Sequence, residues 1–251
     1  MILVYLNCES GVSGDMVLNA LCDLTEDPEA VRANIQRVAE LIKEKGSGAH
    51  EELGIHSHEH HHGHGHNDEH HHGHGHNHSS ESHRSYREVM DIISSVPVSS
   101  RVKTVAEQIY AVIARAESKV HGDSLETLHF HEVGRNQAVA NVMGVAVCID
   151  ALRPDRIIVS DICDGHGTVQ CAHGVLNVPV PAVKAMLDEC DLDYRQTEYE
   201  GEMVTPSGLA MVIGIGAKTG EKPEGTPVRE SEAKGARSFT EHGLTAGLFE
   251  L

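Results

Sequence analysis

The stretch MILVYLNCESGVSGDMVLNALCDL, residues 1–24, predicts the fold class because it combines a strand, a turn and a helix in succession. Ile2–Leu6 is a short apolar run, as expected for a buried strand. Small residues follow at 10–14, and the next segment places Val17 and Leu21 on one helical face. Strands and helices also alternate further along the chain. This order is typical of an α/β fold in which helices cover a sheet.

Further elements are marked by their end signals and by their apolar patterns. Asp27 can cap a helix that begins at Pro28 and ends near Gly46. Ser85 and Glu88 form a capping box for the next helix. The remaining expected elements are a long helix at 102–121, an extended segment at 128–133, an almost wholly apolar helix at 136–152, a strand at 156–162, a Gly/His loop at 165–167, a helix at 182–189, a strand at 194–199 and a short helix at 206–215.

The composition divides the chain into four parts. Residues 1–48 hold the first strand and helices of an α/β domain, and residues 49–84 form a histidine-rich insert. Residues 85–217 hold the remainder of the α/β domain. Residues 218–251 are a polar C-terminal segment without a clear pattern. We therefore expect one α/β domain that carries a disordered insertion.

Charge and composition exclude several classes of function. The 251 residues contain 20 Lys and Arg against 38 Asp and Glu, for a formal net charge of −18. Such acidity argues against nucleic acid as a partner, because phosphate binding needs a basic surface. No apolar run is long enough to cross a bilayer, and the N-terminus lacks the basic region of a signal peptide. The six scattered cysteines then indicate reduced thiols in a cytoplasmic protein without a membrane association.

The histidines provide the strongest chemical signal in the sequence. Fifteen of the 21 lie between His50 and His83, where the sequence EHHHGHGHN occurs at 59–67 and again at 69–77. Imidazole suits divalent nickel, copper, zinc and cobalt, and the affinity order favours nickel over zinc. A flexible, repetitive chain suits capture or storage better than catalysis, and a neutral spacer is the alternative. The expected metal ligands are His58, His60, His61, His62, His64, His66, His70, His71, His72, His74, His76 and His78.

The segment LHFHEVG, residues 128–134, is the best candidate for a structured site. His129 and His131 are two residues apart, so a strand would place them on one face. Glu132 follows, and His173 in its Cys/Gly surroundings can complete the site. The alternative is one core and one surface histidine, because the spacing is not that of an HExxH zinc motif.

Two turns between a strand and a helix are candidates for ligand binding. Ser13 and Gly14 lie in the first turn, and Thr205 and Ser207 lie in the second. Small residues at such turns let backbone N–H groups approach a ligand at the start of a helix. Asp15 can bind a cation or simply complement the helix dipole, and the second turn can equally be an ordinary helix cap.

Several of these motifs occur together and in one order. They are SGVSGDM at 10–16, the histidine-rich insert, HFHEVG at 129–134, CAHGVL at 171–176 with Val178-Pro179, and EMVTPSG at 202–208. In this combination, the chain resembles the N-terminal part of the nickel insertion protein family (LarC), from residue 1 to about 215.

The resemblance implies a function in making the nickel-pincer cofactor. Members of the family insert Ni(II) into pyridinium-3,5-bisthiocarboxylic acid mononucleotide as CTP-dependent cyclometallases, which are lyases. Asp15, His129, His131, Glu132 and His173 are then the expected catalytic residues. Ser13, Gly14, Thr205 and Ser207 are the expected cofactor-binding residues. CTP with a divalent cation is expected to bind outside this chain.

Expected partners and alternative functions follow from how the chain departs from the family. The partners are a separate C-terminal chain or a second copy, and a recipient nickel-pincer enzyme. Family members commonly carry Asp where this chain has Asn7, Gln137 and Asn141. Loss of three carboxylates leaves open a non-catalytic nickel storage protein or metallochaperone. A zinc hydrolase that uses His129 and His131 ranks last, because no third ligand has a recognisable spacing.

Overall fold

The structure is a computed structural model, and it describes residues 1–48, 84–171, 174–237 and 239–251. All twelve histidines that the sequence predicts as metal ligands in the insert lie outside the described residues, and so does His173. The predictions on these residues therefore stay predictions.

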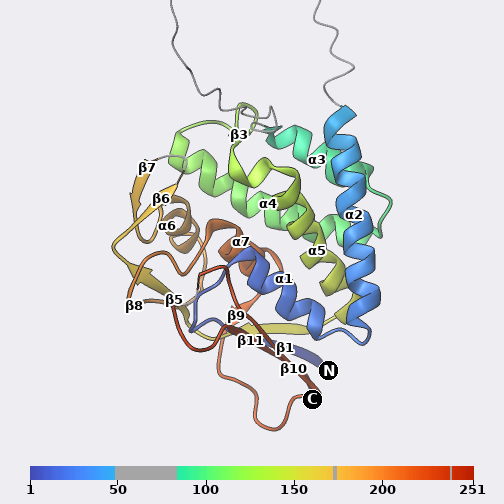
Figure 1. The fold of residues 1–251 in the computed structure, drawn as a ribbon, viewed down its shortest axis with the longest axis vertical. Coiled ribbons are helices and arrows are strands. Elements are labelled where there is room, and N and C mark those ends of the chain that lie inside the picture. The colour runs from blue at the N-terminus through green and yellow to red at the C-terminus, as the bar shows by residue number, and fades with distance from the viewer. Residues whose placement is uncertain (49–83, 172–173, 238) are drawn as a thin grey trace, which may run out of the picture.

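A five-stranded mixed sheet forms one layer of the molecule, with the strand order β10-β11-β1-β4-β9 (Figure 1). Strand β1 is parallel to β4, which is parallel to β9, whereas β11 is antiparallel to both of its neighbours. The strands are β1 (Ile2–Asn7), β4 (Arg156–Val159), β9 (Lys218–Thr219), β10 (Arg229–Ala233) and β11 (Leu244–Glu250).

Helices pack against one face of this sheet. The helices are α1 (Gly14–Asp23), α2 (Pro28–Gly48), α3 (Tyr86–Ser95), α4 (Ser100–His121), α5 (Asn136–Leu152), α6 (Pro181–Leu187) and α7 (Pro206–Gly214). Helix α1 contacts β10 and β11, and α5 contacts α1, α2 and α4 (Figure 1). These findings confirm a mixed α/β architecture whose sheet is packed with helices.

Strand β1 shows how the sequence pattern separates the two faces. Val4 and Leu6 belong to the main core on the helical side, whereas Leu3 and Tyr5 pack with Phe249 in a small cluster on the other side. Alternate residues of a strand point to opposite faces, so an apolar run of this kind needs apolar cover on both.

The predicted helix ends are confirmed where local chemistry determines them. The Ser85 backbone N–H donates to the Glu88 carboxylate at 2.7 Å, and the Glu88 N–H donates to Ser85 Oγ at 3.2 Å, which is the predicted capping box. The Ala30 N–H donates to Asp27 Oδ1 at 3.0 Å at the start of α2. Gly122 ends α4 with a φ of 75°.

Three two-stranded sheets are separate from the main sheet. Strand β2 (Arg84–Ser85) pairs with β3 (His129–Phe130), β5 (Ile162–His166) pairs in parallel with β8 (Tyr194–Glu200), and β6 (Thr168–Cys171) pairs with β7 (Gly174–Asn177) in antiparallel fashion. The strand predicted at 156–162 is divided into β4 and the start of β5, and most of the loop predicted at 165–167 is strand.

The C-terminal segment contributes more to the fold than its sequence indicates. Strands β9, β10 and β11 all come from residues 218–251, and β11 lies between β10 and β1 within the sheet. The apolar residues of β11, such as Leu244 and Leu248, are buried, while the strands before it are short and polar. In the part of the chain described by the structure, no helix combines the length and the apolar character needed to cross a membrane.

Candidate functional site

A cavity of about 400 Å³ lies between the C-terminal end of α4, the β6–β7 hairpin and the starts of α6 and α7. A short 3₁₀ helix, Glu132–Gly134, closes another side. Most of the lining surface is apolar, and eight of the lining residues have polar side chains. A cavity of this size and character is typical of a small-ligand site. The polar lining residues are Glu117, His121, His131, Glu132, Cys171, Glu202, Thr205 and Ser207.

Two imidazoles and a carboxylate come together where α4 ends. Glu117 and His121 are one helical turn apart, and His121 Nε2 lies 3.2 Å from Glu117 Oε2. The ring centroids of His121 and His131 are 5.8 Å apart. The side chains of His121 and Glu117 are 28% and 16% exposed, so solvent screens their interaction only partly. This group of three residues provides nitrogen and oxygen donors at one side of the cavity.

The structure contradicts the prediction that His129 and His131 share one face of a strand. Strand β3 ends at Phe130, and His131 adopts a φ of −87° and a ψ of −94° as the chain enters the 3₁₀ helix. His131 therefore turns into the cavity lining, whereas His129 is exposed and does not line the cavity.

Glu202 is a lining carboxylate whose surroundings alter its ionisation. Burial raises the pKa of Glu202, Arg237 lowers it, and the nearby carboxylates Asp164 and Glu132 raise it further. The net effect is a raised pKa, so Glu202 holds a proton more strongly than an exposed glutamate does. A partly buried carboxylate with a raised pKa beside a cavity is a candidate for proton transfer.

Asp164, on β5, is completely buried and is one of the carboxylates that act on Glu202. Its Oδ1 accepts three backbone hydrogen bonds, from Gly165 at 2.8 Å, Met203 at 2.9 Å and Val204 at 3.0 Å. Burial raises the pKa of Asp164, while these three N–H groups act in the opposite direction. The neighbouring carboxylate raises the pKa of the Tyr194 hydroxyl in addition to the effect of burial.

The two predicted ligand-binding turns lie side by side. The Val12 N–H donates to the Met203 carbonyl and the Thr205 N–H donates to the Val12 carbonyl, both at 2.9 Å. Thr205 caps α7, because its Oγ1 accepts from the Gly208 N–H at 3.2 Å. Gly208 packs so closely on the first turn that a Cβ there would lie 2.6 Å from the Val12 carbonyl oxygen. The backbone thus joins the starts of α1 and α7.

The structure separates the predicted binding residues of these turns into two groups. Thr205 and Ser207 line the cavity, and their hydroxyl oxygens are 3.3 Å apart. Ser13 and Gly14 do not line it. The Ser13 hydroxyl caps α1 by accepting from the Met16 N–H at 3.4 Å, and Gly14 is buried against Ser207 and Met211. Ser13 and Gly14 therefore have structural contacts at the start of α1 and lie outside the cavity lining.

Asp15 lies outside the cavity lining and binds an amide side chain. Asn141 Nδ2 donates to Asp15 Oδ1 at 2.7 Å, and Gln137 Nε2 donates to Asn141 Oδ1 at 2.8 Å. The chain of hydrogen bonds crosses from α5 to α1, next to the lining residue Ala138. Asn141 thus satisfies one oxygen of Asp15, and Gln137 in turn holds the Asn141 side chain.

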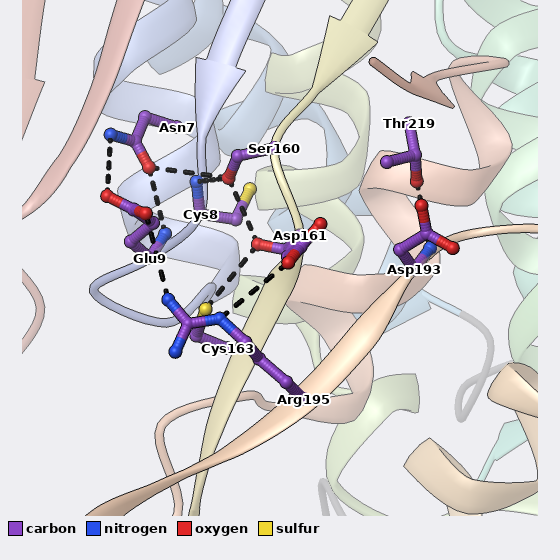
Figure 2. Close-up of polar contacts among 9 residues, drawn as sticks. All are labelled: Asn7, Cys8, Glu9, Ser160, Asp161, Cys163, Asp193, Arg195 and Thr219. Carbon is purple, nitrogen blue, oxygen red and sulfur yellow. Dashed lines mark hydrogen bonds and ion pairs between the residues drawn. The ribbon is translucent and has the colours of Figure 1, made fainter. Parts of the chain in front are cut away.

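Asn7 belongs to a separate polar network at the ends of β1 and β4 (Figure 2). Its Oδ1 accepts from the Glu9 N–H at 3.0 Å and from the Ser160 hydroxyl at 3.3 Å. Arg195 lies 3.7 Å from both Glu9 and Asp161. Asn7 therefore lies in a different network from Gln137 and Asn141. It does not line the cavity.

Six residues of the site were not predicted as site residues from the sequence: Glu117, His121, Cys171, Glu202, Asp164 and Arg237. Glu117 and His121 had a detectable signal, since the spacing Glu-x-x-x-His places both on one side of a helix. Asp164 and Arg237 had none, because their relation to Glu202 depends on tertiary packing. Within the described residues, no three His, Cys, Asp or Glu side chains are arranged to hold a metal ion.

Comparisons with known proteins agree with these motifs. Residues 4–245 match the nickel insertion protein family. Proteins named pyridinium-3,5-bisthiocarboxylic acid mononucleotide nickel insertion protein are similar to the chain. The one from Alkaliphilus metalliredigens is 36% identical over 86% of this chain and 52% of its own length, and the one from Acetivibrio thermocellus is 34% identical over 94% and 57%.

A third relative of the same name, from Geobacillus kaustophilus, is 31% identical over 89% of this chain and 57% of its own length. The chain thus spans about half the length of the curated relatives it matches. No solved structure matches it. Since the family match covers nearly the whole chain, the protein belongs to the nickel insertion protein family.

Proposed function

We propose that the chain binds Ni(II) and inserts it into pyridinium-3,5-bisthiocarboxylic acid mononucleotide, acting as a nickel chelatase of the cyclometallase type. Three relatives carry this substrate in their names. The observation that carries the proposal is the cavity itself, which places two imidazoles on one side and a carboxylate of raised pKa, Glu202, in the same lining.

Nickel is the cargo in this proposal, and it enters at the end of α4. His121, His131 and Glu117 offer borderline and hard donors that suit Ni(II), but they do not by themselves form a three-ligand metal site. The substrate would add its two thiocarboxylate sulfurs, which are softer ligands. Because the substrate supplies part of the ligand set, Ni(II) can leave the protein together with the product. A site that transfers its metal needs this property.

The charge of the cavity suits binding of Ni(II) before the nucleotide substrate. Glu117, Glu132 and Glu202 make the lining acidic, which attracts a divalent cation and repels an anionic nucleotide. Bound Ni(II) offsets that repulsion. Thr205 and Ser207, at the start of α7, then offer hydroxyl groups to the substrate phosphate. Ser13 and Gly14 hold this turn in place.

Glu202 is the proposed general base. Forming the carbon–nickel bond replaces a ring hydrogen, so one proton must leave the carbon as the metal binds to it. A carboxylate can accept that proton, and a raised pKa makes it a stronger base than an exposed glutamate. Glu132 raises the same pKa and lies in the same lining.

The amide network around Asp15 favours a second candidate, a nickel storage protein or metallochaperone without turnover. Asn141 donates a hydrogen bond to an oxygen of Asp15, and Gln137 donates to Asn141, at positions where carboxylates would favour a cation. In this alternative, the histidine-rich insert would hold Ni(II), and the cavity would not perform the insertion.

One experiment distinguishes the two candidates. The purified chain is incubated with NiCl₂ and the bisthiocarboxylate mononucleotide, with and without CTP and Mg²⁺, and the nickel-containing product is measured by mass spectrometry. Adding a recipient nickel-pincer apoenzyme provides a second readout, its activation. Product formation supports insertion. Nickel binding without product under every condition would contradict insertion and support storage.

A parallel reaction tests whether the chain acts with partners. A separately expressed C-terminal part of one of the longer relatives is added to the same mixture. Product that forms only with this addition would assign CTP use to the added part and nickel delivery to this chain.

A further inference from the structure

Asp164 is a buried carboxylate that the proposed reaction does not use directly. Its side chain has no exposed surface, and no ion pair of the described residues includes it. Burying an unpaired carboxylate costs several kcal/mol in order of magnitude, whereas an apolar side chain would cost nothing of this kind. A residue of this type needs a reason beyond filling space.

The hydrogen bonds of Asp164 show what it does to the backbone. One oxygen, Oδ1, accepts from the N–H groups of both Met203 and Val204, at 2.9 and 3.0 Å. It also accepts from the N–H of the next residue, Gly165, at 2.8 Å. The carboxylate thus ties β5 to the segment that connects β8 with α7.

That segment carries two residues of the cavity. Glu202 immediately precedes the two bonded amides, and Thr205 immediately follows them. The Gly201 N–H also donates to the His166 carbonyl of β5 at 2.8 Å, and Val12 bonds the Met203 carbonyl and the Thr205 N–H, both at 2.9 Å. Removing Asp164 would leave two buried N–H groups without their acceptor, and this cost favours a shift of the backbone between Glu202 and Thr205.

We propose that Asp164 is a positioning residue that sets where the Glu202 carboxylate and the Thr205 hydroxyl lie in the cavity. This inference rests on the proposed function for its catalytic meaning. The hydrogen bonds themselves do not depend on that function, so the position of the segment can be tested separately from turnover.

The first test measures hydrogen exchange of the Met203 and Val204 amides in the full chain. Asp164→Asn keeps an oxygen acceptor, so these amides should stay protected as in the unaltered protein. Asp164→Ala removes the acceptor, so their protection should fall by at least about tenfold. Asp161→Ala is the matched control, because Asp161 lies three residues away with a half-exposed side chain and should change nothing.

The second test measures insertion kinetics on the same variants. Misplacing a reacting group by about 1 Å can cost about 100-fold in rate, so Asp164→Ala should lower kcat by that order with less than about a threefold change in KM for the nucleotide. Asp164→Asn should stay within about threefold of the unaltered protein.

Several outcomes overturn the assignment. Unchanged amide protection in a folded Asp164→Ala variant would show that the carboxylate does not hold the segment. An Asp164→Asn variant that is unfolded, or inactive with protected amides, would show that the negative charge is needed. If Asp164→Ala does not fold, the asparagine variant alone decides. Changed exchange in Asp164→Ala without turnover in the unaltered protein would contradict only the proposed function.

Discussion

The protonation state of Glu202 controls the proposed step most directly. Burial and the neighbouring carboxylates Asp164 and Glu132 raise its pKa, and a base works only when it is deprotonated. We therefore expect kcat to fall as the pH is lowered through the raised pKa of Glu202, which lies above the value of about 4.3 for an ordinary glutamate. Glu202→Gln should lower kcat by about 100-fold or more at neutral pH.

The measurement is a pH–rate profile of product formation, with Glu200→Gln as the control. Glu200 lies two residues away and is exposed on β8, outside the cavity lining. A Glu202→Gln variant with the full rate would exclude Glu202 as the base. A flat profile for the unaltered chain would show that no group of this pKa limits the reaction.

The two histidines of the 129–134 segment should behave differently. His131 lines the cavity 5.8 Å from the His121 ring, whereas His129 is exposed outside it. His131→Ala should abolish product formation while total bound nickel changes little, because the insert is expected to hold most of the metal. His129→Ala should leave both quantities unchanged. Nickel analysis by mass spectrometry, together with the insertion assay, checks both variants.

Turnover kept in His131→Ala would exclude His131 from the reaction, and nickel lost in the same variant would show that the insert does not hold most of the metal.

The sequence predicted the cavity residues His131, Glu132, Thr205 and Ser207 because they lie in motifs. It could not place His131 relative to His129, because the end of β3 depends on the packing of the Phe130 ring against Tyr86 and Tyr110. Contacts between residues far apart in the sequence could not be predicted either, because they too depend on tertiary packing.

At the scale of elements, strong local signals predicted well. Helix α5 was expected at 136–152 and has these bounds, because nearly every residue in it is apolar and it can pack on several sides. The capping box of α3 depends on two neighbouring side chains alone. By contrast, the β6–β7 hairpin is short, mostly polar and partly exposed, and its sequence does not alternate clearly. Such strands need their tertiary context.

The contact between the starts of α1 and α7 provides a test at this scale. A Cβ at Gly208 would lie 2.6 Å from the Val12 carbonyl oxygen and 2.7 Å from Ser13 Cα, and both are backbone atoms that cannot move alone. Gly208→Ala should therefore lower the free energy of unfolding by about 1–3 kcal/mol, measured by urea denaturation. It should also lower kcat, because Thr205 moves with the helix.

Gly235→Ala is the control for this prediction. The new Cβ would meet the flexible thioether of Met16 at 3.0 Å, which can move aside. We expect a smaller loss of stability than for Gly208→Ala. Equal losses in the two variants would show that the close approach of the two turns is not what makes Gly208 necessary.

At the scale of the whole molecule, a domain with a cavity is combined with a long histidine-rich insert. The sheet needs β11 from the end of the chain beside β1 from its beginning, which the polar sequence before it did not indicate. Antiparallel pairing between distant segments leaves little local signal. The insert, in turn, is recognisable from its high histidine content alone, because the proposed metal binding requires many imidazoles and no particular fold.

Nickel loading of the full chain should depend strongly on pH. A proton competes with the metal for the same imidazole lone pair, and free histidine titrates near pH 6.5. Loading should therefore weaken sharply between about pH 7.5 and about pH 5.5, as measured by equilibrium dialysis with NiCl₂. Loading that stays constant over this range would assign the metal to carboxylates or thiolates.

Deletion of residues 54–83 tests how the insert and the cavity divide the function. Ile55 is the only aliphatic residue in that stretch, so its removal takes almost no apolar area from a core. In metal-free buffer, the Tm should stay within a few degrees of that of the full chain, whereas most bound Ni(II) should be lost. With saturating NiCl₂, the shortened chain should still form product, because the cavity residues all lie outside the deletion. At limiting nickel, its rate should fall below that of the full chain, since the proposed reservoir is gone. A large drop in Tm would show that the insert supports the fold, and equal rates at limiting nickel would remove the reservoir from the proposal.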